Sequence, residues 1–196
     1  MTVLRALTRT ILASSSLGAA LLLAGCAAPR DRFYTLEARP AAAPAAADRF
    51  SAHVLLGVSL PIVVDRREMV LETASDQVTV FEHERWAGPL TDLVSQTLAR
   101  DLERRRPDVI VAGRGFDRPG AAPISVRVDV IRMTARRGGE AALEAHWRIV
   151  QPASAVDVVG GDTFTAPIGS EDFAAVAAAF SACLESLAAR LAEKLP

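Results

Sequence analysis

The chemistry of Cys26 is set by the residues in front of it. The run Leu23-Ala24-Gly25-Cys26 ends an apolar stretch that begins at Ile11, and Arg5 and Arg9 precede that stretch. A basic start, a short apolar run and small residues before a cut are typical of a secretory leader. The apolar run is shorter than the ~20 residues that cross a bilayer. The pattern therefore predicts that residues 1–25 are removed and that the Cys26 thiol accepts a lipid.

Lipidation at Cys26 predicts a permanent anchor. A lipoprotein cysteine of this kind carries a thioether-linked diacylglycerol and an amide-linked acyl chain, and each buried methylene contributes about 0.8 kcal/mol. Residue 27 is Ala rather than Asp, which under the sorting pattern of Gram-negative lipoproteins predicts the outer membrane, with the folded part in the periplasm. Membrane lipids are thus an expected partner. Acylation also leaves Cys183 without a second thiol for an intramolecular disulfide.

Metal-binding and nucleophilic motifs are missing from the sequence. The three histidines, His53, His83 and His146, do not lie four residues apart or beside a cysteine pair, so no metal site is predicted. His83-Glu84 lacks the second histidine of a metalloprotease motif. No nucleophile elbow or phosphate loop is present. The formal net charge of -1 gives no electrostatic footprint for nucleic acid. We expect no catalytic residue and no cofactor.

Several short polar patterns have simpler explanations than a site. Asp101 and Glu103, like Glu82 and Glu84, lie two residues apart, and the helical pair does not share a face. We expect both pairs to be solvated charges. Gly160-Gly161 interrupts a β-like stretch and is predicted to form a turn or bulge.

Two long helices are predicted from apolar residues at three- and four-residue intervals. The first runs from Leu90 to Arg106, with Pro89 suited to its first turn and Pro107 ending it. The second follows Ser170 and Asp172, either of which can cap it. Its apolar face consists of Phe173, Val176, Phe180, Cys183, Leu187 and Leu191. This position predicts that Cys183 is a buried, inert thiol.

Alternating or continuous apolar runs predict the strands. Residues 69–72 and 77–82 form one predicted hairpin, and the segment 124–150 forms another across its glycine-containing loop. The first helix supplies the crossover that a parallel strand pair needs. Further strands are expected at residues 33–36, 53–64, 109–111 and 156–165, and residues 37–51 form an Ala/Pro-rich loop. The sequence predicts one α/β domain over residues 26–196, with a mixed β-sheet packed against two long helices.

Together these features resemble the PqiC/YmbA family of ABC-type transport auxiliary lipoproteins. The resemblance rests on the lipid-acceptor motif, on Phe33-Tyr34-Thr35-Leu36, on Leu60-Pro61 with Asp65-Arg66, and on the run from Glu84 to Leu90, Glu-Arg-Trp-Ala-Gly-Pro-Leu. It covers essentially the whole mature chain. Gly88 departs from the pattern, because the family usually has a larger polar residue there.

The resemblance implies a non-enzymatic role in transport of lipids or hydrophobic compounds across the envelope. Implied partners are a periplasmic MCE-domain protein and its inner-membrane permease and ATPase. The lipoprotein would dock the MCE assembly to the outer membrane. Arg85, Trp86 and Leu90 are the candidate docking residues, although Trp86 is also a candidate core residue wedged under the helix.

A periplasmic lipid-binding carrier is the alternative function, and an envelope hydrolase has little support from the motifs. A large pocket lined by Leu and Phe would favour the carrier. A filled core with an exposed apolar patch would favour docking.

Overall fold

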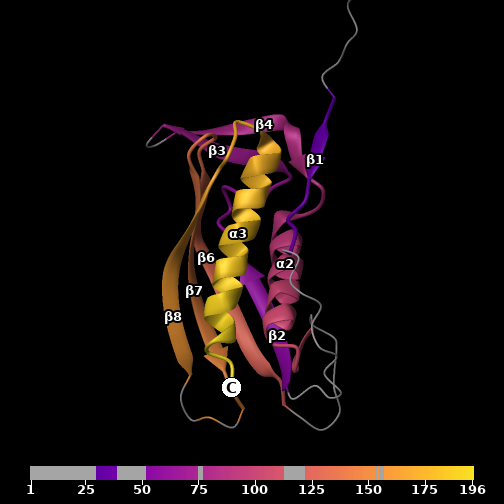
Figure 1. The fold of residues 1–196 in the computed structure, drawn as a ribbon, viewed down its shortest axis with the longest axis vertical. Coiled ribbons are helices and arrows are strands. Elements are labelled where there is room, and N and C mark those ends of the chain that lie inside the picture. The colour runs from indigo at the N-terminus through magenta and orange to yellow at the C-terminus, as the bar shows by residue number, and fades with distance from the viewer. Residues whose placement is uncertain (1–29, 39–51, 75–76, 113–121, 153, 155–156) are drawn as a thin grey trace, which may run out of the picture. The chain divides into compact units, whose positions relative to one another are not determined.

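Two β-sheets and two helices make up the part of the chain that the structure describes (Figure 1). The computed structural model describes residues 30–38, 52–74, 77–112, 122–152, 154 and 157–196, of which those from Asp31 onward belong to one compact unit. The predicted leader and most of the Ala/Pro-rich loop lie outside these residues. The elements are β1 (Arg32–Tyr34), β2 (Ala52–Ser59), β3 (Glu68–Ala74), β4 (Gln77–Trp86), α2 (Leu90–Arg105), β5 (Val109–Ala112), β6 (Ile124–Ala135), β7 (Glu140–Val150), β8 (Val158–Pro167) and α3 (Phe173–Ala192).

The larger sheet has the strand order β5-β2-β6-β7-β8. β2 pairs in parallel with both β5 and β6, whereas β7 pairs antiparallel with β6 and β8. The connection from β2 to β5 contains α2, so the predicted helical crossover is confirmed. The predicted β6–β7 hairpin is also confirmed, and Gly138 in its turn has a φ of 65°, a conformation that favours glycine.

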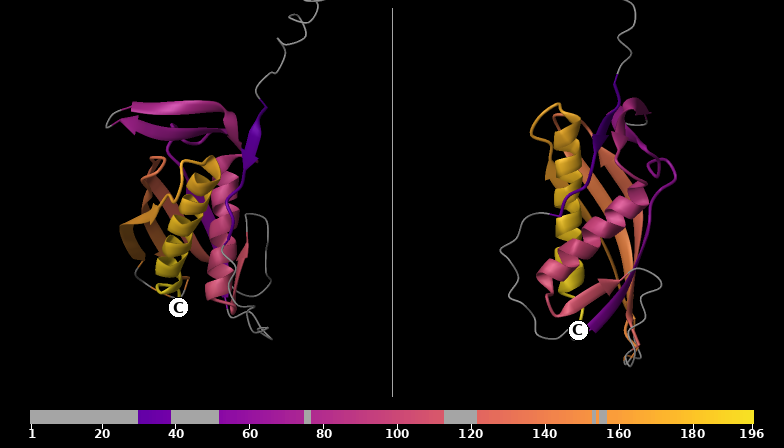
Figure 2. Two further views of the ribbon diagram at one scale, coloured as in Figure 1. Left: turned by 45° about the horizontal axis from the view of Figure 1, so that its top comes forward. Right: turned by 90° about the vertical axis from the view of Figure 1, so that its right-hand side faces the viewer.

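The smaller sheet has the order β1-β4-β3 and lies across one end of the larger sheet (Figure 2, left). β3 and β4 form the predicted hairpin, and β1 pairs in parallel with the far half of β4, with Arg32 opposite Glu84 and Tyr34 opposite Trp86. The α/β class with two long helices is therefore confirmed, but the strands divide between two sheets.

Both helices cover the same face of the larger sheet (Figure 2, right). In α2 the buried side chains include Leu90, Val94, Leu98 and Leu102, which follow the predicted stripe. In α3 all six residues of the predicted apolar face are buried. The two stripes and the inner side chains of the sheet form one hydrophobic core.

α3 is long and apolar enough, by length and composition alone, to cross a membrane. Most of the residues in its apolar window are buried inside the protein, against β7, β8 and α2. α3 is therefore the central helix of the core.

Two predictions about polar patterns are wrong. Gly160 and Gly161 lie in regular register within β8, opposite Trp147 and His146. A Cβ on Gly160 would lie 2.7 Å from the Trp147 indole, so the glycine makes room for a buried ring rather than for a turn. Asp101 is 1% exposed and forms an ion pair with Arg104, one helical turn away, so it is not a solvated charge.

Cys183 provides a direct test of the packing around α3. Its side chain is fully buried, and burial raises the pKa of the thiol to about 11. We expect the acylated native protein to remain unmodified by a thiol-specific chromogenic reagent at pH 8, and to react at one thiol per chain after denaturation. Equal rates in the native and denatured states would contradict this packing.

Candidate functional site

The segment that joins β4 to α2 carries the three candidate docking residues. Trp86 is the last residue of β4, and its backbone N–H donates to the carbonyl of Arg67 at 2.7 Å. Leu90 is the first residue of α2. The Trp86 indole is 3% exposed and lies against α3, with its ring centroid 6.4 Å from that of Phe180. Leu90 is 1% exposed. In this structure both side chains belong to the core, beneath the surface that a partner would touch.

Arg85 is placed differently from its two neighbours in the motif. Its side chain is 34% exposed and forms ion pairs with Glu68 of β3, at 2.7 Å, and with Asp31 beside β1, at 3.3 Å. Asp31 also lies 2.9 Å from the His83 ring, and Glu68 also pairs with Arg66 at 3.2 Å. We call Arg66, Glu68, Arg85, Asp31 and His83 the surface ion-pair chain. It runs from β3 across β4 to the residue that precedes β1.

Hydrogen bonds within the surface ion-pair chain favour the ionised forms of its two carboxyl groups. The hydrogen bond with His83, with a further contribution from Arg85, lowers the pKa of Asp31 below its ordinary value. The hydrogen bond from Arg85 lowers the pKa of Glu68. Both carboxylates are therefore held ionised.

A second polar group ties β1 to β4 on the buried side. Glu84 is 6% exposed. The prediction that it is a solvated charge is therefore wrong. It forms an ion pair with Arg32 and accepts a hydrogen bond from the Tyr34 hydroxyl at 2.7 Å. Burial, reinforced by that hydrogen bond, raises the pKa of Tyr34 to about 12. Glu84 is thus engaged by two residues of β1, and this arrangement serves attachment of the strand.

Among the described residues, no cluster of three or more His, Cys, Asp or Glu side chains has the arrangement of a metal site. The charged groups around Arg85 and Glu84 pair with each other and lie between strands. Their geometry suits holding β1 in place and presenting a charged surface.

A family model for the ABC-type transport auxiliary lipoprotein component matches residues 34–192. The chain belongs to this family. Auxiliary lipoprotein components of ABC-type transport are not a known enzyme family, and lipoproteins of this family are membrane-anchored in the periplasm. The resemblance noted in the sequence is therefore confirmed.

Two solved structures share the fold of this auxiliary lipoprotein. Protein XCC0632 from Xanthomonas campestris, described as a member of family DUF330, has a TM-score of 0.65 at 20% identity, and the match covers 82% of this chain and 92% of that one. An uncharacterized protein has a TM-score of 0.70 at 15% identity, with 85% and 99% covered. None of the curated proteins compared with the sequence matches it.

Sequence reasoning selected Arg85 as a candidate but did not place Asp31 and Glu68 beside it. Asp31, Glu68 and Glu84 lie up to 54 positions from their partners, and no local pattern relates them. The one usable signal was the position of Arg85 in a family motif.

The surface ion-pair chain predicts a pH dependence of stability. The folded-state pKa values of Asp31 and Glu68 lie below their ordinary values of 3.8 and 4.5. Their contribution is therefore present above about pH 4.5 and is lost as the pH falls through the folded values. We expect the melting temperature of the wild type to fall below this pH. The fall should be smaller in Asp31→Asn. Parallel curves for the two proteins in thermal unfolding followed by circular dichroism would contradict the role of Asp31.

Proposed function

We propose that this auxiliary lipoprotein is the non-enzymatic outer-membrane subunit of an MCE-type ABC system that transports lipids or hydrophobic compounds. In this role it docks the periplasmic MCE assembly, which connects to an inner-membrane permease and ATPase, to the outer membrane. The observation that carries the proposal is the family match over residues 34–192. The motif that ends in Cys26, followed by Ala27 rather than Asp, supports the outer-membrane location.

Arg85 is the candidate docking residue with an accessible side chain. Arginine is enriched among residues that dominate binding energy at interfaces, and Arg85 is held in a fixed position by Glu68 and Asp31. Trp86 and Leu90 support the same surface from below, since they fix the end of β4 against the helices. We therefore assign contact to Arg85 and positioning to its two buried neighbours.

The cavities favour docking over the carrier function. An apolar groove lined by Pro61, Val63, Val70, Val78 and Ile131, among others, has a volume of about 190 Å³. Pockets that enclose a small-molecule ligand usually begin at about 300 Å³. The groove is lined by valines rather than by Leu and Phe, and it opens at the surface. A larger hollow of about 560 Å³ lies between β8 and α3, but it is lined mainly by polar and charged side chains, such as Arg105, Asp162 and Glu185, which do not suit a lipid chain.

Replacing Arg85 tests the docking surface. Arg85→Gln removes the charge and should weaken copurification with the MCE-domain protein by roughly tenfold, the loss typical of an arginine at the centre of an interface. Arg148→Gln is the matched control, because Arg148 lies on β7 of the larger sheet, with a side chain 62% exposed. Thermal melting of both variants measures folding separately.

Variants of Trp86 separate loss of binding from loss of folding. Removing a buried tryptophan side chain costs about 3–5 kcal/mol, so an Arg85 and Trp86 double replacement measures folding as well as binding. Trp86→Phe keeps most of the packing and the exposed surface. Unchanged affinity in a folded Arg85→Gln variant would remove Arg85 from the interface and leave the transport role standing.

Acylation is the second prediction from the proposed function. Mass spectrometry of protein purified from membranes should show a chain that starts at Cys26 and carries the added mass of the lipid groups. Cys26→Ser should abolish that mass and release the chain from the lipoprotein pathway. An intact Met1, or a chain cut elsewhere without lipid, would contradict the anchor.

A further inference from the structure

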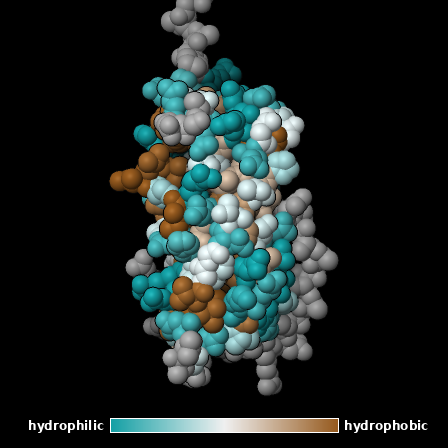
Figure 3. Space-filling model, turned by 90° about the vertical axis from the view of Figure 1, so that its left-hand side faces the viewer, coloured by the Kyte–Doolittle hydropathy of each residue, from teal (hydrophilic) through white to brown (hydrophobic). Residues whose placement is uncertain are grey.

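Exposed hydrophobic side chains gather at one place on this protein. Among the described residues, eight large hydrophobic side chains are exposed: Phe33, Ile62, Val63, Val78, Val80, Ile131, Val150 and Val159. Five of them, Ile62, Val63, Val78, Val80 and Ile131, lie in or beside the apolar groove. Figure 3 shows such a gathering of hydrophobic residues on one side of the molecule. Scattered exposed hydrophobics are ordinary, whereas a contiguous patch marks a contact surface.

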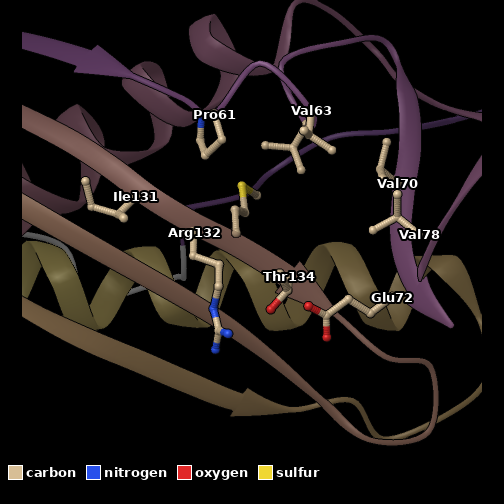
Figure 4. Close-up of a pocket in the computed structure, with 10 residues that line it drawn as sticks. Pro61, Val63, Val70, Glu72, Val78, Ile131, Arg132 and Thr134 are labelled. Atoms are coloured by element: carbon tan, nitrogen blue, oxygen red, sulfur yellow. The ribbon is translucent and has the colours of Figure 1, made fainter. Parts of the chain in front are cut away.

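The groove is formed by three separate segments (Figure 4). Pro61 and Val63 come from the loop between β2 and β3, Val70 and Val78 from the smaller sheet, and Ile131 from β6. Val80 stands opposite Val70 in the β3–β4 ladder and continues the patch. Ile62, at the loop, is 91% exposed. The surface therefore combines an apolar groove with a projecting apolar tip.

The charges next to the loop balance one another, because Asp65 and Glu68 stand beside Arg66 and Arg67. Asp65 accepts a hydrogen bond from the Thr91 hydroxyl at 2.8 Å, and Glu68 pairs with Arg66 and Arg85. Arg66 and Arg67 are exposed. An apolar tip that projects from a charged rim can bury its apolar area at the boundary between the headgroups and acyl chains of a bilayer.

The length of the tether limits the distance between the lipid anchor and this patch. Cys26 is five residues before Asp31, so the connecting chain spans at most about 17 Å. Asp31 adjoins β1, the edge strand of the smaller sheet. Val80 is four residues along β4 from Glu84, the residue that pairs with Arg32, which is about 13 Å. The anchored strand and the patch thus belong to the same small sheet.

We propose that the Ile62–Val63 loop and the valines of the β3–β4 hairpin form a second, non-covalent contact with the lipid bilayer in which Cys26 is anchored. This inference rests on the proposed acylation of Cys26. Two contacts together fix the orientation of the domain relative to the membrane, whereas a single point of attachment does not.

Fluorescent labelling of the acylated protein in vesicles tests the contact. Cys26 is consumed by lipid and Cys183 is buried, so an introduced cysteine is the reactive thiol. An environment-sensitive fluorophore is placed at Ile62→Cys, at Val78→Cys and, as the control, at Val159→Cys. Val159 is 66% exposed and pairs with Arg148, away from the groove. The vesicles contain phosphatidylethanolamine and phosphatidylglycerol, and a portion of the lipids carries a nitroxide quencher on the acyl chain.

We expect the labels at positions 62 and 78 to shift to shorter emission wavelength and to be quenched by the nitroxide lipids, with the label at 159 unchanged. Adding Ile62→Asp to the Val78→Cys protein should return the label at 78 to water while the protein still floats with the vesicles. This second variant keeps the test valid if labelling at 62 itself weakens insertion.

The failures of the two proposals differ in this experiment. Protein that does not float with vesicles refutes the anchor, and with it the second contact. Floating protein whose labels at 62 and 78 are quenched no more than the label at 159 refutes the bilayer contact alone. If the labels at 62 and 78 are shielded from water only after the MCE-domain protein is added, the patch is a protein interface and the proposal is overturned.

Discussion

The architecture depends on burying α3. This helix is apolar over nearly its whole length, and a helix of that kind must be covered on several sides to be stable in water. The larger sheet and α2 cover most of it. The smaller sheet covers the rest at the amino-terminal half, where Phe81 lies 4.8 Å from Phe173 between ring centroids and Trp86 lies 6.4 Å from Phe180. The position of the smaller sheet, and of β1 at its edge, follows from this packing.

Local periodicity accounts for what the sequence predicted correctly. Both helices follow from apolar residues at three- and four-residue spacing, and the β6–β7 hairpin follows from alternation on both sides of a glycine loop. The division into two sheets did not follow, because the pairing of β1 with β4 joins residues 52 positions apart. Burial of Glu84 and Asp101 was missed for a related reason. Their arginine partners neutralise them, and the surrounding sequence does not distinguish such charges from solvated ones.

The candidate site shows the same limit. The motif from Glu84 to Leu90 supplied the candidate docking residues, but a motif in sequence does not separate residues that contact a partner from residues that hold them. Adjacent positions in β4 point to opposite sides, so Arg85 meets solvent while Glu84 and Trp86 are buried. Alternation alone does not say whether Arg85 or the pair Glu84 and Trp86 is buried. The packing of β4 against α3 decides that Trp86 and Glu84 are.

The parallel pairing of β1 with β4 also has a mechanical consequence. Under the proposed anchor, any pull between the membrane and the domain enters the fold through the three residues Arg32–Tyr34. Tension along β1 loads its ladder hydrogen bonds together, in shear, rather than peeling them one at a time. The ties from Arg32 to Glu84, and from Asp31 to Arg85 and His83, lie at the point where the load enters. A short parallel strand reinforced by these ion pairs can transmit force from the membrane to the core.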